Sequence, residues 1–287
     1  MNAMGGPATI DLKALSERFD SFLLDQFGVL HDGNAAYSGA VEALAHLKAA
    51  GKRVVLLSNS GRRAGPNEER LERLGFPRES WDRLVTSGEV AWHLLSGHGP
   101  EKRIPPGSRC LYFARDGDRT AIEGLDLQLV SDGADADLVL IAGSEADLLT
   151  LDDYHGMLAP AAVRGVPCMC TNPDKIMLTA SGPRPGAGRI AEIYTELGGK
   201  VRWIGKPFKD IYQTALDALG NPDPARVVCV GDSVEHDIAG GHGAGLATAL
   251  VRSGILADLP AEAVSALYRE HGAAPEFVLP GFYWTAG

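Results

Sequence analysis

Short runs of apolar residues alternate along this chain with amphipathic segments, and several of these runs end in a polar residue. The first clear run, Phe-Leu-Leu at 22–24, ends in Asp25, and a second run at 53–57 ends in Ser58. Between them, 38–51 carries one apolar stripe at helical spacing. Uninterrupted apolar runs of this length are typical of strands buried on both faces, so the pattern predicts βαβ units and a parallel sheet.

The same alternation continues to the end of the chain. Further strands are expected at 84–86, 108–114, 125–130, 138–143, 166–171, 201–204, 226–230, 246–251 and 277–279. The pattern also predicts a long helix at 146–162 and a crossover turn at 182–188, where glycine and proline are dense. Strands and helices in this order indicate an α/β protein.

Composition narrows the class of protein. With 287 residues and 45% hydrophobic residues, the chain can bury a full core in one or two modules. A formal net charge of −10 argues against nucleic acid or an anionic membrane as partner. The 4 cysteines are too few and too scattered for a disulfide framework, and neither a signal peptide nor a membrane-spanning run is visible. These features favour a cytoplasmic protein.

Four predicted strands end in polar side chains that can carry chemistry. These side chains are Asp25, Ser58, Lys206, and Asp232 with Asp237. Taken singly, Ser58 is explained as a helix cap and Lys206 as a turn lysine, but parallel strands bring their carboxyl ends to one edge of a sheet. Asp232 and Asp237 would repel each other around a turn unless a cation or hydrogen-bond donors compensated them. Mg²⁺, which prefers oxygen ligands, would do so and would let a phosphate dianion approach Asp25.

The order of these residues resembles the four motifs of the haloacid dehalogenase (HAD) superfamily of phosphotransferases. The last motif is Gly-Asp-Ser-Val-Glu-His-Asp at 231–237, and the match spans about 22–251. The sequences at 28–32, 57–60, 171–174 and 205–207 resemble the class IIA branch, the NagD-like sugar-phosphate and nucleotide phosphatases.

The resemblance implies a doubly wound parallel sheet, a HAD-like Rossmannoid core, at 1–80 and 186–287. An α/β cap domain of C2 type would be inserted at 81–185. It further implies an enzyme acting on a small phosphorylated substrate, with no nucleic acid or membrane as partner. The acidic surface is compatible with a homodimer formed through the cap.

The resemblance also implies roles for the strand-end residues. Asp25 would be the nucleophile that forms a phosphoaspartyl intermediate, and Ser58 would donate to the phosphoryl oxygens. Lys206 would neutralise the nucleophile and the phosphate. Asp25, Asp232 and the backbone carbonyl of Phe27 would hold Mg²⁺, while Asp237 would either assist the metal or orient Lys206.

The resemblance further implies that other residues contact the substrate. Asn59 would add a donor, by its backbone or its side chain, and Ser60 lies beside it. Asn172, Pro173 and Asp174 in the cap are expected to line the substrate entrance.

Phe27 departs from the pattern, because these phosphatases usually carry a second Asp there as general acid and base. The backbone carbonyl survives this change, but the proton carrier does not. General acid or base catalysis is typically worth ~10²–10⁴ in rate, or roughly 3–5.5 kcal/mol of barrier. The loss falls mainly on poor leaving groups, so we expect activated phosphates to be favoured or turnover to be slow. His31 or Asp32 could replace the proton carrier or could simply shape the loop.

Three other readings fit part of the pattern. A haloacid dehalogenase needs no metal and gains little from the acidic motif at 231–237. A receiver domain also has Asp and Lys on a doubly wound sheet, but it is shorter and its motifs come in another order. The serious alternative is a catalytically impaired HAD-like protein that binds a phosphorylated ligand or a protein partner.

Overall fold

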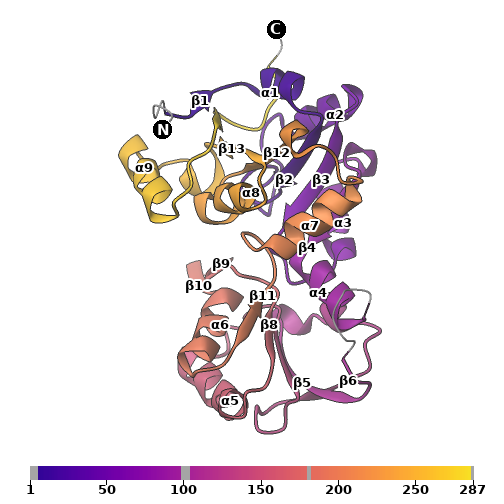
Figure 1. Cartoon of the computed structure of the whole chain (residues 1–287), viewed down its shortest axis with the longest axis vertical. Helices are drawn as coiled ribbons and strands as arrows, with labels where there is room; N and C mark the ends of the chain where they lie inside the picture. The colour runs from indigo at the N-terminus through magenta and orange to yellow at the C-terminus, as the bar shows by residue number, and fades with distance from the viewer. Residues whose placement is uncertain (1–5, 98–103, 180–181, 286–287) are drawn as a thin grey trace. The chain divides into compact units, whose positions relative to one another are not determined.

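The computed structural model describes residues 6–97, 104–179 and 182–285, which form two compact units. Unit 1 takes its residues from Met1–Ser58, Asn67–Val85 and Lys206–Gly287, and unit 2 from Asn59–Pro66 and Thr86–Gly205 (Figure 1). The resemblance noted in the sequence implies that 186–205 belongs to the core domain. In the structure this stretch belongs to unit 2, because its strand and helix pack on the sheet of that unit.

Unit 1 is built on a seven-stranded sheet with the order β1-β14-β13-β12-β2-β3-β4. Its strands are β1 (Ala8–Thr9), β2 (Ser21–Asp25), β3 (Arg53–Ser58), β4 (Arg83–Thr86), β12 (Val227–Gly231), β13 (Ala247–Val251) and β14 (Phe277–Leu279). The pairs β2·β3, β2·β12, β12·β13, β13·β14 and β1·β14 are all parallel. The α/β class and the parallel sheet predicted from the sequence are therefore confirmed.

Strand β2 lies at the topological switch point of this sheet. Phe22 is the register partner of Val54 in β3 on one side and of Val228 in β12 on the other. From β2 the chain proceeds outward through β3 and β4 in one direction, and through β12, β13 and β14 in the other. Ligands of open α/β sheets bind beyond the carboxyl ends of the strands at such a point.

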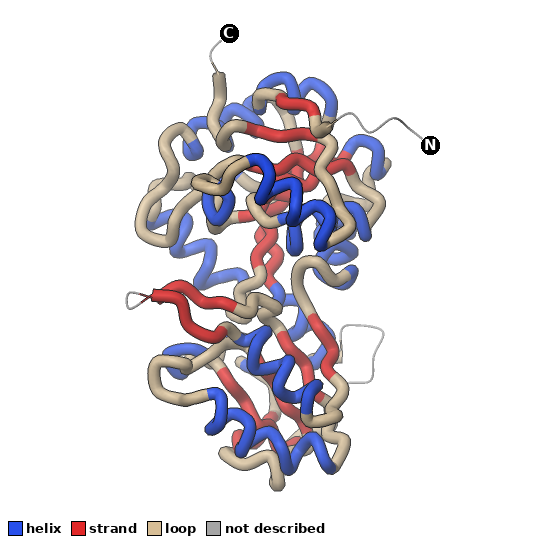
Figure 2. The backbone as a smooth tube through the Cα atoms, turned by 90° about the vertical axis from the view of Figure 1, so that its left-hand side faces the viewer, coloured by secondary structure: helices blue, strands red, loops and turns tan. Residues whose placement is uncertain are grey.

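Helices flank the strands of each sheet, seen as blue and red tubes in Figure 2. Those of unit 1 are α1 (Leu12–Arg18), α2 (Ala40–Ala49), α3 (Ala64–Arg73, whose first turn belongs to unit 2), α7 (Lys209–Ala218), α8 (Ala239–Gly243) and α9 (Ala261–Glu270). The chain then ends against the same unit, because Phe282 is buried and the Trp284 ring stacks on His46 of α2 with centroids 5.0 Å apart. The aromatic tail is thus docked on unit 1.

Unit 2 contains a five-stranded sheet with the order β11-β8-β7-β5-β6, all pairs parallel. Its elements are β5 (Ser108–Phe113), β6 (Leu127–Val130), β7 (Leu138–Ile141), β8 (Cys168–Cys170), β11 (Val201–Trp203), and the helices α4 (Ser87–Leu95), α5 (Leu151–Val163) and α6 (Ala187–Glu196). A separate antiparallel pair is formed by β9 (Ile176–Thr179) and β10 (Gly182–Pro185).

Two expectations for unit 2 were wrong. The helix expected at 146–162 begins only at Leu151, because Thr150 caps it in a reciprocal capping box with Asp153. The crossover turn expected at 182–188 begins instead with strand β10, whose extended backbone pairs with β9. Glycine and proline made this stretch look like a turn, but the hairpin partner decides its conformation.

The core of unit 2 lies between its sheet and helices α5 and α6. Tyr154 and Tyr194 are its largest fully buried residues, and the Tyr194 hydroxyl donates to the Val166 carbonyl over 2.6 Å. Cys168 and Cys170 share this core, because residues two apart in a strand point to the same face of the sheet. No helix within the described ranges is long and apolar enough to cross a membrane.

Leu158 and Leu148 form a matched pair for testing this core. Leu158 in α5 is 0% exposed, whereas Leu148, in the loop before that helix, is 81% exposed. Leu158→Ala leaves a cavity and should lower the stability of unit 2 by about 2–5 kcal/mol. Leu148→Ala should change it by less than about 0.5 kcal/mol. Urea denaturation followed by circular dichroism measures both, and equal midpoints for the two variants would contradict this packing.

Candidate active site

Unit 1 brings one lysine and three aspartates together beyond the carboxyl ends of β2 and β12. The Lys206 Nζ lies 2.7 Å from an oxygen of Asp25 and 2.7 Å from an oxygen of Asp237. Oxygens of Asp25, Asp232 and Asp237 lie within 4.8 Å of one another. The side chains of Lys206, Asp237 and Asp25 are only 4%, 6% and 11% exposed. Four residues singled out in the sequence therefore form one buried cluster.

Local structure explains how Asp237 reaches Lys206. Residues Val234–Ile238 form a single π-helical turn, which two intervening residues separate from the end of β12. Within it the Ser233 amide donates to the Asp237 Oδ2 over 3.2 Å, while the Asp237 Oδ1 accepts from Lys206. A Cβ at position 231 would overlap the Asp237 carboxyl group, so only glycine permits this turn. Single π-helical turns are frequent at functional sites.

The electrostatics of the cluster follow from three carboxylates sharing one ammonium group. Burial, helped by the charges of Asp237 and Asp232 and opposed by Lys206, raises the pKa of Asp25 to about 8. Burial alone would lower the pKa of Lys206, but the charges of Asp237 and Asp25 outweigh it and raise that pKa. The lysine therefore stays charged, and the cluster retains negative charge that a divalent cation would balance.

The donor set of the cluster fits Mg²⁺, because it consists of oxygens alone. Asp237 binds Lys206 and the Ser233 amide through its two oxygens, which suits orienting the lysine better than holding a metal. Asp232 lies between the α-carbons of Gly28 and Gly254, where a Cβ at either position would overlap its carboxylate. Asp25 and Asp232 are thus the side chains best placed as metal ligands.

In the loop after Asp25, the polar side chains form hydrogen bonds with the backbone of the loop itself. The buried His31 accepts the Gly33 amide at its Nδ1 over 3.0 Å, and burial lowers the His31 pKa to about 4. The Asp32 Oδ1 accepts the amides of Asn34 and Ala35, both over 2.8 Å. These contacts favour the loop-shaping role for His31 and Asp32, since a neutral imidazole with so low a pKa is a poor proton donor at neutral pH.

Phe27 stands in this loop with its side chain partly open to solvent. The residue is 42% exposed, and its ring meets the His31 ring edge to face at 5.9 Å. Ser58 is the last residue of the neighbouring strand β3, one position beyond Leu57, the register partner of Asp25. Strand pairing therefore places Ser58 at the same sheet edge as the aspartate.

The remaining expected site residues belong to unit 2. The Asn59 amide group donates to the Asp174 carboxylate over 2.8 Å, and the Asp174 amide donates to the Asn172 side chain over 3.1 Å. Pro173 and Asn59 both lie against the α-carbon of Gly205. The Ser60 carbonyl accepts a hydrogen bond from the Gly88 amide over 3.0 Å, which fixes the backbone at Ser60. These residues form a second cluster. In the sequence, its member Asn59 follows Ser58 directly, and Gly205 precedes Lys206 directly.

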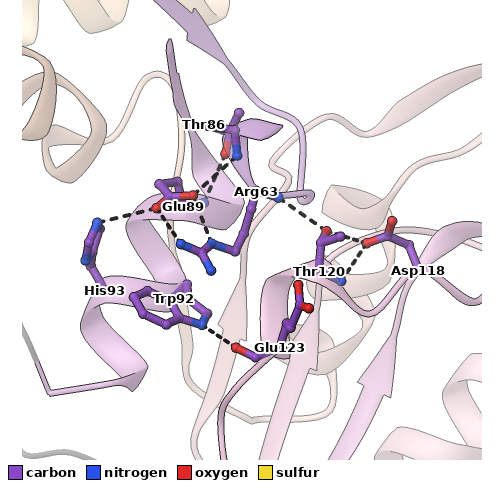
Figure 3. A network of polar contacts seen from close by, with 9 residues as sticks. Arg63, Thr86, Glu89, Trp92, His93, Asp118, Thr120 and Glu123 are labelled. Atoms are coloured by element: carbon purple, nitrogen blue, oxygen red, sulfur yellow. Dashed lines mark hydrogen bonds and ion pairs between the residues drawn. The ribbon is translucent and has the colours of Figure 1, made fainter. Parts of the chain in front are cut away.

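A polar network fixes the segment 59–66 within unit 2 (Figure 3). Arg63 binds both oxygens of Glu89 at 3.0 Å, and its guanidinium lies 4.0 Å from the centre of the Trp92 ring. Glu89 is in turn placed by Thr86, which caps α4 and accepts the Glu89 amide over 3.0 Å. Bidentate pairing and ring stacking together leave Arg63 little freedom.

The sequence does not single out two residues that lie beside Asp232 and Gly28, namely Ser253 and Gly254. They follow β13, and the Ser253 hydroxyl donates to the Gly28 carbonyl over 2.6 Å. The sequence signal that could have found them is a polar residue and a glycine shortly after an apolar run, the same pattern that singled out the other strand ends. It was weak here because serine and glycine are ordinary turn residues.

These residues form a candidate active site on a doubly wound sheet. Residues 22–128 match the family model of haloacid dehalogenase-like hydrolases, and 203–283 match a second model of HAD-like hydrolases. Chronophin from Rattus norvegicus is 31% identical over 264 residues, covering 89% of this chain and 83% of the relative. The chain belongs to the haloacid dehalogenase-like hydrolases, which confirms the resemblance noted in the sequence and its enzymatic nature.

Two solved structures extend this similarity over most of the chain. A haloacid dehalogenase-like hydrolase from Brucella suis is 28% identical with a TM-score of 0.80, covering 96% of this chain and 99% of that one. The glycerol phosphate phosphatase from Mycobacterium tuberculosis in complex with magnesium is 26% identical with a TM-score of 0.72, covering 93% and 77%. The second structure shows that a relative of this chain binds magnesium.

Removing the lysine tests the charge balance of the cluster. Lys206→Met leaves buried carboxylates unpaired and should lower the free energy of unfolding at neutral pH by about 3–5 kcal/mol. Without the ammonium, the folded-state pKa of Asp25 rises further above its unfolded value. The loss should therefore grow as pH rises above about 8, where the Asp25 carboxyl ionises in the folded wild type but not in the folded variant.

Lys175→Met is the matched control, because Lys175 forms an exposed ion pair with Glu192 at 2.9 Å. It should cost less than about 1 kcal/mol and show little pH dependence. Urea denaturation at several pH values measures both variants. Equal losses for the two lysines would show that the buried cluster does not depend on its ammonium.

Proposed function

We propose that this chain is a Mg²⁺-dependent phosphohydrolase that works through a phosphoaspartyl intermediate on Asp25. The observation that carries the proposal is the buried cluster in which Lys206 contacts Asp25 and Asp237. An oxygen of Asp232 lies within 4.8 Å of oxygens of both aspartates, close enough for one metal ion to bind them together. Nucleophile, cation and metal ligands are the parts that phosphoryl transfer requires.

Each group has a role that its surroundings support. An Asp25 oxygen attacks phosphorus, and the bond from phosphorus to the leaving oxygen breaks with its electron pair going to the leaving group. Water then attacks the phosphoaspartate, releasing inorganic phosphate and restoring Asp25. Lys206 offsets charge on the nucleophile and the phosphate, Asp237 orients Lys206, and Ser58 donates to the phosphoryl oxygens.

Mg²⁺ would be held by Asp25, Asp232 and the Phe27 carbonyl, and when bound it would offset negative charge on the phosphoryl group. The oxygen-only donor set and the magnesium complex of the glycerol phosphate phosphatase support this choice of metal. Asp237 would belong to the supporting shell of the metal rather than to its ligands.

Phe27 narrows the range of substrates. A phenyl ring cannot give the leaving oxygen a proton, and neither His31 nor Asp32 is arranged to replace it. We infer that phosphates whose leaving group departs as a stabilised anion react faster than alkyl phosphates. Loss of the base also slows the attack of water on the phosphoaspartate.

The second cluster supplies the proposed contacts to the rest of the substrate. Asn59, Ser60, Asn172, Pro173 and Asp174 are fixed by hydrogen bonds and close packing within unit 2, so they can present defined polar groups. The substrate would be a small phosphorylated metabolite such as a sugar phosphate, a nucleotide or an activated phosphate. A homodimer through unit 2 and a cytoplasmic location stay predictions from the sequence.

Phosphate release tests the proposed function directly. Acetyl phosphate and glycerol 3-phosphate should be compared with and without Mg²⁺, using Asp25→Asn as the blank. Release should require both Mg²⁺ and Asp25 and should be faster from acetyl phosphate, whose leaving group needs no proton. If Asp25→Asn released phosphate as fast as the wild type, the phosphoaspartyl mechanism would be wrong. An absence of Asp25-dependent release across a wider set of phosphates would favour a ligand-binding protein.

Restoring a carboxylate at position 27 tests the role of Phe27. Phe27→Asp should raise kcat for glycerol 3-phosphate by up to about 10²–10⁴, because it supplies a general acid and base. The gain for acetyl phosphate should be smaller and confined to the attack of water. Phe27→Asn serves as the control, since it offers a polar side chain that cannot carry the proton. Equal effects of the two variants on glycerol 3-phosphate would contradict the proton-transfer explanation.

A further inference from the structure

Three chain segments meet at Gly28, the residue that follows Phe27. Its α-carbon, with φ of +87°, packs against the Asp232 carboxylate after β12. Its amide donates to the His31 carbonyl over 2.9 Å. Its carbonyl accepts the Ser253 hydroxyl over 2.6 Å from the segment after β13. Gly28 is therefore held at its amide, its α-carbon and its carbonyl.

These contacts set the direction of the Phe27 carbonyl. That carbonyl and the Gly28 amide belong to one planar trans peptide unit, in which C=O and N–H point in opposite directions. Because the amide points at the His31 carbonyl, the Phe27 carbonyl points away from it. The Ser253 hydroxyl fixes the next peptide unit, so Gly28 cannot rotate without breaking one of the two hydrogen bonds.

The segment after β13 also touches Asp232 directly. Gly254, with φ of +55°, lies against the Asp232 carboxylate and against the α-carbon of Gly28. A Cβ at position 254 would overlap both groups. Ser253 thus holds the backbone of the loop after Asp25, and Gly254 packs against the Asp232 carboxylate.

We propose that Ser253 is a positioning residue for the metal site. Its hydroxyl, by holding the Gly28 carbonyl, keeps the Phe27 carbonyl and Asp232 in the arrangement that binds Mg²⁺. The proposal rests on the proposed function, since it assumes that these two groups hold the metal. Residues that orient metal ligands typically contribute 10–100-fold to metal affinity or activity.

Mg²⁺ binding to the substrate-free, full-length protein tests this role. The rise of the melting temperature with Mg²⁺ concentration yields a dissociation constant for each variant. Ser253→Ala should raise that constant about 10-fold, because the Gly28 carbonyl loses its donor. Ser253→Thr should restore it, since threonine keeps the hydroxyl and suits the extended backbone at φ −128° and ψ −167°.

Ser16→Ala is the matched control, because the Ser16 hydroxyl also donates to a backbone carbonyl, that of Lys13, over 2.7 Å. It lies in α1 and should leave the Mg²⁺ dissociation constant unchanged. Wild-type affinity in Ser253→Ala, or failure of Ser253→Thr to restore affinity, would overturn the positioning role.

Asp232→Asn separates failure of this inference from failure of the proposed function. If Asp232→Asn abolishes the Mg²⁺ effect while Ser253→Ala leaves it intact, the metal site stands and only the role of Ser253 is wrong. If Mg²⁺ raises the melting temperature of Asp232→Asn as it does that of the wild type, the metal site itself is wrong, and the role of Ser253 falls with it.

Discussion

The candidate active site depends on one buried ammonium group, that of Lys206, which partly balances the negative charge of the aspartates around it. Without Lys206, three aspartates within 4.8 Å of one another would repel in a region that water hardly reaches. With it, two of the three carboxylates have a partner at 2.7 Å, and the negative charge that is left over suits a divalent cation. The rest of unit 1 serves to bring the ends of β2 and β12 close to this lysine.

The sequence predicted the parts of the site that depend on strand order. Asp25, Ser58 and Asp232 stand at strand ends, and parallel pairing of β3, β2 and β12 is enough to bring those ends to one edge. Apolar runs that end in a single polar residue are visible without a structure. Only the geometry showed that Asp237 uses both oxygens to hold its neighbours, because a π-helical turn has no clear sequence signal.

Other features could not be read from the chain because distant contacts decide them. Ser253 is one polar turn residue among many until its hydroxyl is seen on the Gly28 carbonyl. The stretch 182–185 has the composition of a turn, but pairing with β9 extends it. The stretch 186–205 lies next to Lys206 in the sequence, yet strand pairing and burial assign it to unit 2. Local propensity is a weak guide wherever tertiary pairing competes with it.

The position of β2 between β3 and β12 also has a consequence for the order of folding. Unit 2 draws most of its residues from one continuous stretch, Thr86–Gly205, so its contacts can form while the chain is still being synthesised. Strand β2 acquires its second neighbour only after residues 227–231 have been made. Pairings between such distant segments close slowly, because the entropy of a long loop must be overcome first. We therefore expect the carboxylate cluster to be among the last parts of the protein to assemble.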